Sequence, residues 1–209
     1  VKTGRVSKKY IASSIVKEVL KLPAFADVPQ ETLDYMVSDL DDVIPKELLN
    51  PGAHVFLYNG PHDGESTSEE FKRMNPKGSD RVYSYDLKNG KDNDIFGPLW
   101  STLVHSAIQG RIRTIIGGPN CKTWSILLQR PSDKFPSQRR SRDNPWKAMN
   151  PEEQFLIDQE SNLLLRMLVI IVISHVLGFP LAHFLEHPED PEKDFQGKLD
   201  LLTEEQAKV

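Results

Sequence analysis

Apolar residues repeat at helical spacing through the first 50 positions of the chain. Residues 7–22 are predicted to form a helix that Pro23 ends. Its apolar face consists of Ile11, Ile15, Val16, Val19 and Leu20. Residues 29–49 repeat the same period, at Leu33, Met36, Val37, Leu40, Val43 and Ile44. Pro51 and Gly52 then mark a break, so we expect an accessory helical region over residues 1–50.

After this break, short apolar runs alternate with helical segments. The runs predict strands at 54–58, 81–85, 113–116 and 181–185. Helices are expected to begin near Ser66, over 99–109, and from Pro151 to about residue 177. Strands that alternate with helices indicate βαβ crossovers and a parallel sheet. We therefore expect an α/β fold over residues 51–209: a Rossmann-like three-layer sandwich with a mostly parallel sheet, beside the N-terminal helical region.

The most apolar stretch of the chain is residues 163–177, which contain Arg166 and His175. It is shorter than the roughly 20 residues of a membrane span, so a buried helix is expected and no membrane partner. Its predicted core face consists of Leu163, Leu164, Met167, Leu168 and Ile171.

Composition narrows the choice of compartment and partner. The net charge of −4 gives no global basic field for nucleic acid, so any such binding needs a local patch. Cys121 is the single cysteine, which excludes an internal disulfide and fits a reducing, intracellular location. The six histidines show no metal-ligand spacing, so no metal is predicted.

Ligands of open parallel sheets bind at the carboxyl ends of the strands, and the first two strand ends have suitable residues. Gly60 and Gly64 lie in the turn after the first strand, where glycine lets a ligand approach the backbone. Asp86 follows Gly64 by 22 residues, the spacing of a ribose-binding acid. Asp94, just downstream, could face an adenine ring. An ordinary tight turn and a solvated aspartate remain the alternatives.

The third and fourth strand ends offer a thiol and a carboxylate. Gly118 and Pro119 place Cys121 on a sharp turn, and the adjacent Lys122 favours the nucleophilic thiolate. Glu186 ends the fourth strand, where a catalytic carboxylate is commonly delivered. The alternatives are a structural cysteine and a glutamate that caps a backbone N–H.

A long polar loop follows the cysteine and contains a basic patch. Lys134 and the arginines Arg139, Arg140 and Arg142 lie there, with Trp146 nearby. Guanidinium groups of this kind bind phosphate backbones. A solvated basic loop is the competing interpretation.

Two of these strand ends resemble motifs of the cytosine-C5 DNA methyltransferases. The matching residues are Gly118-Pro119-Asn120-Cys121 and Leu185-Glu186-His187, and the resemblance covers roughly residues 54 to 190. It implies that Cys121 attacks C6 of an extruded cytosine while Glu186 holds N3. It also implies S-adenosylmethionine as cofactor, held by Gly60, Gly64, Asp86, Asp94 and Gly118, with DNA bound by Arg139, Arg140 and Arg142.

The chain departs from the family's pattern in several places. The first turn has fewer glycines and an added Pro61, Lys122 stands where the family has Gln, and His187-Pro188 replaces Asn-Val. The late motifs and the target-recognition region of the family are absent, so we expect a domain truncated at its C-terminus. The chain also resembles a methyltransferase-like segment of protist retroelement polyproteins. This implies other parts of a longer polyprotein as partners, and a nuclear location for an enzyme acting on DNA.

Three hypotheses follow from the sequence. The first is a methyltransferase-like enzyme acting on DNA, active or degenerate. The second is a non-catalytic module of a larger polyprotein that keeps this fold and binds nucleic acid or protein. The third is a different cysteine-using or nucleotide-binding Rossmann enzyme.

Overall fold

A computed structural model describes residues 11–59, 66–118, 146 and 151–186 of the chain. By its internal contacts the chain divides into two units. One comprises Val1–Asn120 with Ser161–Glu186, and the other Cys121–Glu160 with His187–Val209. The sheet lies entirely in the first unit. In the second, the Gln154 side chain donates hydrogen bonds to the Trp146 carbonyl and to Asp158 Oδ1, both at 2.8 Å.

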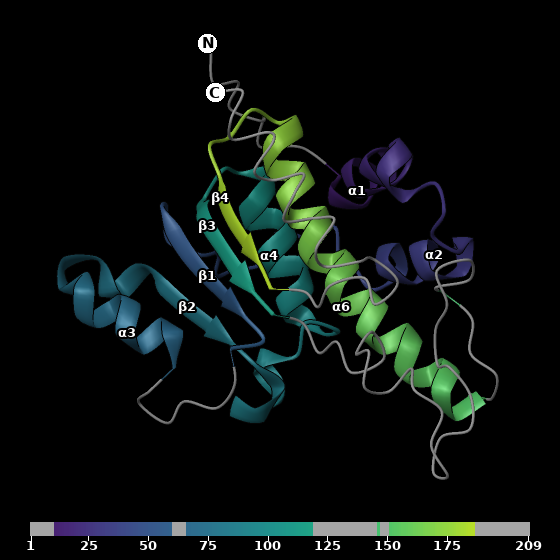
Figure 1. Cartoon of the computed structure of the whole chain (residues 1–209). Coiled ribbons are helices and arrows are strands. Elements are labelled where there is room, and N and C mark those ends of the chain that lie inside the picture. The colour runs from purple at the N-terminus through teal and green to yellow at the C-terminus, as the bar shows by residue number, and fades with distance from the viewer. Residues whose placement is uncertain (1–10, 60–65, 119–145, 147–150, 187–209) are drawn as a thin grey trace, which may run out of the picture. The chain divides into compact units, whose positions relative to one another are not determined.

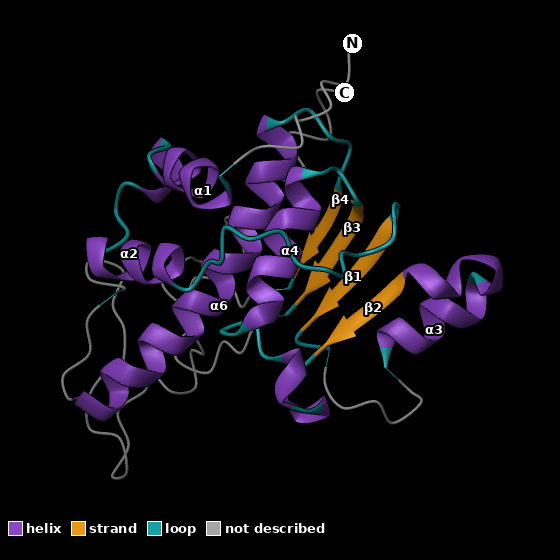
Figure 2. Cartoon of the chain, turned by 180° about the vertical axis from the view of Figure 1, so that it is seen from behind, coloured by secondary structure: helices purple, strands orange, loops and turns teal. Residues whose placement is uncertain are grey.

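The core of the first unit is a four-stranded, all-parallel sheet with the order β2-β1-β3-β4. The strands are β1 (Ala53–Leu57), β2 (Val82–Tyr85), β3 (Ile112–Gly117) and β4 (Ala182–Leu185). In Figure 2 the four arrows point the same way. Val55, Phe56 and Leu57 are all buried, as expected of a parallel strand covered on both faces. The predicted α/β, Rossmann-like fold is confirmed.

Three helices connect the strands: α3 (Thr67–Met74), α4 (Pro98–Ile108) and α6 (Pro151–Val176). The step from β1 to β2 runs toward one edge of the sheet, and the later steps run toward the other. Because crossovers are right-handed, α3 lies on one face, while α4 and the part of α6 from Ser161 onward lie on the other, as Figures 1 and 2 show. Short 3-10 turns, η2 (Pro76–Arg81), η3 (Leu87–Asn89) and η4 (Lys91–Asn93), flank β2.

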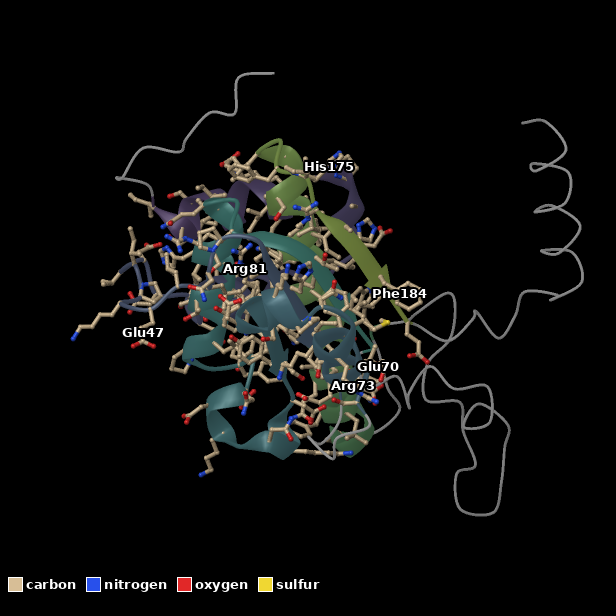
Figure 3. The ribbon with its side chains drawn as sticks, turned by 90° about the vertical axis from the view of Figure 1, so that its left-hand side faces the viewer. Glu47, Glu70, Arg73, Arg81, His175 and Phe184 are labelled. Carbon is tan, nitrogen blue, oxygen red and sulfur yellow. The ribbon has the colours of Figure 1, made fainter. Side chains whose placement is uncertain are left out.

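The face covered by α3 is only partly protected. Phe71 of α3 packs on His54 and Phe56 of β1, with ring centroids 4.8 and 5.5 Å apart. Phe56 is in register with Ile116, and Ile116 with Phe184 of β4. Phe184 remains 65% exposed, and Figure 3 labels it on β4. The outer strand β4 is therefore the least covered part of the sheet.

The N-terminal helices pack on the outer side of α4. They are α1 (Ala12–Leu20), the 3-10 turn η1 (Pro23–Phe25) and α2 (Gln30–Ser38). The Trp100 Nε1–H donates to the Met36 carbonyl at 3.0 Å, and the Asp41 N–H donates to Ser101 Oγ at 2.9 Å. Since the sheet covers its other side, α4 is buried at nearly every position from Leu99 to Ile108.

The second predicted helix was wrong in its length. It ends at Ser38 rather than near residue 49, and Val43, expected on its apolar face, is 71% exposed. Asp39 forms an ion pair with Arg166, and the Asp41 carbonyl accepts a hydrogen bond from His105 Nε2. These contacts hold residues after Ser38 in a non-helical path along α4.

The predicted core face of α6 was also wrong. Of the residues assigned to it, only Met167 is buried, and the other four are half-buried. The buried face runs through Leu165, Arg166, Val169, Ile170 and Ile173 instead. The helix itself matches its predicted span. Among the described residues, no helix is long and apolar enough to cross a membrane.

Candidate functional site

The candidate site lies along the carboxyl edge of the sheet. The chain leaves β1 toward β2 and leaves β3 toward β4, although β1 and β3 are neighbours. The order of connections therefore reverses between β1 and β3, and a switch point of this kind is the usual ligand position in such folds. Across the edge, in sheet order, lie Asp86, Tyr58 with Asn59, Gly118, and Glu186.

The chain leaves β1 through a strained residue. Tyr58 has φ +60°, a left-handed conformation that bulky side chains rarely adopt. Its N–H continues the pairing with β2 by donating to the Tyr85 carbonyl at 2.8 Å, and its hydroxyl donates to the Leu163 carbonyl of α6 at 2.8 Å. Burial raises the pKa of the Tyr58 phenol. Strain of this kind is concentrated at functional sites, and it fixes the direction in which the following turn begins.

Asn59 anchors this turn to its neighbours. Its Nδ2 donates to Ser68 Oγ at 2.8 Å and to Ser84 Oγ at 3.3 Å. Ser68 is fully buried in the first turn of α3 and lies 3.1 Å from Ser66 Oγ. The start of the turn is therefore tied to both α3 and β2. The candidate cofactor residues Gly60 and Gly64 lie outside the described residues.

Asp86 sits where β2 ends, as predicted. Its Oδ1 accepts the Lys88 N–H at 2.9 Å and its carbonyl accepts the Asn89 N–H at 2.8 Å, so it caps η3. Capping of a turn by Asp86 corresponds to the alternative that was considered beside ribose binding. A carboxylate can accept about four hydrogen bonds, so the cap does not exclude a ribose contact.

Asp94 begins a tight loop, residues 94–97, between η4 and α4. Its Oδ1 accepts the Phe96 N–H at 3.0 Å, and its carbonyl accepts the Gly97 N–H at 3.1 Å. Asp94 is half-buried, while the next residue, Ile95, is 3% exposed. The loop thus presents the Asp94 carboxylate, while the Ile95 side chain packs into the core. Whether Asp94 faces an adenine ring stays a prediction.

Gly118 and Glu186 come together at the ends of β3 and β4. The Glu186 N–H donates to the Gly117 carbonyl at 2.9 Å, which continues the strand pairing by one residue. A Cβ placed on Gly118 would lie 3.3 Å from Glu186 Oε2, so the carboxylate lies over the glycine backbone. Glu186 is exposed. It can therefore reach a ligand at this edge.

Several predicted site residues lie outside the described part of the chain. They are the candidate nucleophile Cys121 and the candidate DNA-binding residues Arg139, Arg140 and Arg142. Cys121 follows Gly118 by three positions in the sequence. The structure therefore brings the Glu186 carboxylate to Gly118, close in sequence to Cys121. The role of the thiol stays a prediction.

Sequence reasoning missed two features of this edge. The first is the pair Tyr58 and Asn59, whose side-chain hydrogen bonds fix the start of the turn after β1. The second is Arg166, whose guanidinium is buried and donates to the Ile95 carbonyl in loop 94–97 at 2.9 Å. A signal for the second was present, because Arg166 is a lone charge within a long apolar run.

Comparison with known proteins adds no assignment: no family model, curated protein or solved structure matches the chain. What is shown is a parallel α/β domain of Rossmann type, with three carboxylates and a topological switch point along one edge.

Proposed function

We propose that this chain is an S-adenosylmethionine-dependent methyltransferase-like domain that methylates C5 of cytosine in DNA. The observation that supports it most directly is the approach of Glu186 to Gly118. It sets a carboxylate beside the loop that continues to Cys121, as the resemblance of these two segments to the cytosine-C5 enzymes requires.

The charges along this edge favour S-adenosylmethionine over a nucleotide. Asp86, Asp94 and Glu186 are acidic, and the first turn of α3 contains Glu69 and Glu70. Glu69 and Glu70 each form an ion pair with a basic residue one turn on, Lys72 and Arg73. The acidic character of this edge therefore comes chiefly from Asp86, Asp94 and Glu186, which would repel a pyrophosphate. A ligand with a sulfonium and an ammonium group is attracted there instead. This argument weighs against the third hypothesis, a nucleotide-binding enzyme.

The residues divide the cofactor and the base between two parts of the edge. Asp86 and Asp94, with the glycines of the turn after β1, hold the adenosine of the cofactor. Glu186 and Cys121 hold the cytosine on the β3 and β4 side. Neighbouring strands are about 4.8 Å apart, so the step from β1 to β3 gives the two groups a separation that a methyl donor can span.

The chemistry assigns each residue a definite task. The Cys121 thiolate forms a bond to C6 of the extruded cytosine, while Glu186 gives a proton to N3, so that the ring builds up no negative charge as the thiolate adds. S-adenosylmethionine supplies an electrophilic methyl group, which C5 takes as S-adenosylhomocysteine leaves. A base removes the C5 proton, the bond from sulfur to C6 breaks, and N3 gives up its proton. The products are 5-methylcytosine, S-adenosylhomocysteine and one proton.

The arginines of the loop after Cys121 complete the proposal as contacts to phosphate. The slope of log affinity against log salt concentration is negative, and each phosphate contact makes it steeper by roughly 0.9. Replacing Arg139, Arg140 and Arg142 with glutamine should flatten that slope accordingly. An unchanged slope would show that this loop does not contact DNA.

A covalent trap tests the enzymatic proposal. DNA containing 5-fluorocytosine retains fluorine at C5, so the adduct with the thiol cannot collapse after methylation. With S-adenosylmethionine present, the full chain should form an adduct that survives denaturation, and Cys121→Ala should form none. Glu186→Gln should slow adduct formation by about 10²-fold or more, the lower range for loss of an acid catalyst.

Titration calorimetry with S-adenosylmethionine separates the hypotheses if the trap fails. Binding that is weakened by Asp86→Asn, without any adduct, identifies a non-catalytic module that has kept its cofactor site. If the chain does not bind the cofactor at all, the proposal is refuted, and the third hypothesis, a different cysteine-using or nucleotide-binding Rossmann enzyme, is favoured.

A further inference from the structure

Arg166 is the most unusual buried residue of the structure. It lies on α6 with a side chain that is 0% exposed. Arginine is almost never buried so completely unless it is paired. The residue therefore needs an explanation beyond the packing of an apolar helix.

The guanidinium joins segments that are distant in the sequence. Its Nη1 lies 2.7 Å from Asp39 Oδ2, just after α2, and donates to the Ile95 carbonyl at 2.9 Å. Three rings surround it, which we call the aromatic cage. Its Cζ is 4.8 Å from the Trp100 centroid, 4.9 Å from that of Phe96 and 5.6 Å from that of Tyr35. Cation–π attraction of this kind is strongest where water is excluded.

Stability alone does not account for this arrangement. Arg166 Nε and Nη2 are buried and have no hydrogen-bond partner among the described residues. Burial lowers the pKa of Arg166 and raises that of Asp39, against the opposing effect of their ion pair. Desolvation thus outweighs attraction for both partners, and a well-packed apolar side chain is often as stabilising as such a pair. An apolar side chain cannot, however, donate a hydrogen bond to Ile95.

Among the described residues, this bond is the hydrogen bond that links the loop to α6. The other hydrogen bonds that the described residues make to 94–97 are local: Asp94 N–H to Lys91 O, Phe96 N–H to Asp94 Oδ1, Gly97 N–H to Asp94 O, and Trp100 N–H to Gly97 O. They fix the shape of the turn but not its place relative to α6. The bond from Arg166 to Ile95 supplies that link.

We propose that Arg166 is a positioning residue that holds loop 94–97 at the carboxyl edge, so that Asp94 is set for the adenosine of the cofactor. Asp39 positions the guanidinium in turn, which couples the N-terminal helices to the cofactor loop. The cofactor part of this inference rests on the proposed function, whereas the control of the loop does not.

Two measurements on the full chain test the proposal. In Arg166→Met, amide hydrogen exchange at Phe96 and Gly97 should rise roughly 10-fold or more without ligand, the factor expected for one lost charge-assisted hydrogen bond. Binding of S-adenosylhomocysteine should weaken by a similar factor. Arg166→Lys keeps the charge but not the planar fork, so it should loosen the loop with a smaller loss of stability.

Val169→Ala is the matched control. Val169 is also 0% exposed on α6, so its truncation lowers the unfolding temperature without removing a donor to the loop. Exchange at Phe96 and Gly97, measured well below that temperature, should stay at the parent rate, and so should ligand affinity.

The outcomes separate the two claims. Unchanged exchange in both Arg166 variants, or an equal rise in Val169→Ala, overturns the positioning role. A looser loop with unaltered affinity shows that the loop does not serve the cofactor. If the parent chain binds no S-adenosylhomocysteine, the proposed function fails, and the exchange data still decide whether Arg166 orders the loop.

Discussion

The Glu186 N–H donates to the Gly117 carbonyl, so the ends of β3 and β4 remain paired beyond the last residue of β4. This bond fixes the backbone of Glu186, and the bare Gly118 gives its carboxylate room to lie against the neighbouring chain. The position of the candidate catalytic acid is therefore set by two consecutive glycines at the end of the neighbouring strand β3.

Gly118→Ala should impair the reaction without unfolding the protein. The new Cβ would lie 3.3 Å from Glu186 Oε2, so the carboxylate must move by a few tenths of an ångström. Displacements of about 1 Å can cost about 10²-fold in rate, and we expect trap formation to slow by roughly 10-fold. The unfolding free energy should stay within about 0.5 kcal/mol of the parent.

Gly78→Ala is the control for this change, because nothing lies within 4 Å of the Cβ that it would add. It should leave both the rate and the stability at parent values. A Gly118→Ala variant that forms the adduct as fast as Gly78→Ala would show that the position of Glu186 is not limiting.

Gly117→Ala should act on stability instead. Its Cβ would meet Met167 Sδ at 2.8 Å and the Leu57 carbonyl at 3.1 Å. The methionine can move, but the carbonyl belongs to the sheet and cannot. Overpacking of this kind costs about 1–3 kcal/mol. Urea denaturation should show that loss, and a parent-like midpoint would mean that β1 and β3 can separate without penalty.

Removal of residues 1–50 should prevent cooperative folding of the remainder. The deletion removes the Met36 carbonyl to which Trp100 donates, uncovers Trp100, which is 0% exposed, and leaves Arg166 buried without Asp39. The boundary at residue 50 is so far a prediction from the sequence. Residues 51–209 alone should bind hydrophobic dyes and unfold without a sharp transition.

A milder variant tests the same interface within the full chain. Met36 is 0% exposed, so Met36→Ala should cost about 2–5 kcal/mol. If residues 51–209 unfold cooperatively with the midpoint of the full chain, the N-terminal helices are accessory, as their sequence alone indicates.

The sequence predicted the fold well because its signals were local. Val55, Phe56 and Leu57 form an apolar run short enough for a strand, and Pro98 and Pro151 each begin a helix close to the predicted start. Strands alternating with helices then left few topologies. Gly118 and Glu186 follow the third and fourth strands directly, as the strand predictions required, and their part in binding a ligand stays a prediction.

The errors arose where tertiary contacts override local pattern. Residues after Ser38 keep helical spacing, but Asp39 and Asp41 are held by contacts with α6 and α4. The buried face of α6 was misplaced because the helix is apolar on most sides, so periodicity could not choose between them. It includes Arg166, whose partners Asp39 and Ile95 lie 127 and 71 positions away in the sequence.

The stability of the fold should fall in mild acid through His54. Burial lowers the pKa of its imidazole below the usual 6.5, with further effects from Arg113 and Arg81. The unfolded chain then takes up a proton near pH 6.5 that the folded chain resists. Because the unfolded state binds more protons in that range, the contribution of His54 to stability is complete above pH 6.5 and is lost as the pH falls below it.

His54→Gln tests this effect while keeping a polar group near Thr114 Oγ1, which lies 3.1 Å from the His54 Nδ1. Unfolding free energies measured at about pH 7.5 and about pH 5.5, on either side of the ordinary histidine pKa, should differ less in this variant than in the parent. His175→Gln, at an exposed position on α6, serves as the control and should keep the parent's difference. If His54→Gln and the parent lose the same unfolding free energy between the two pH values, other groups cause the acid sensitivity of the fold. The contact between His54 and Phe71 would then be an uncharged packing contact at both pH values.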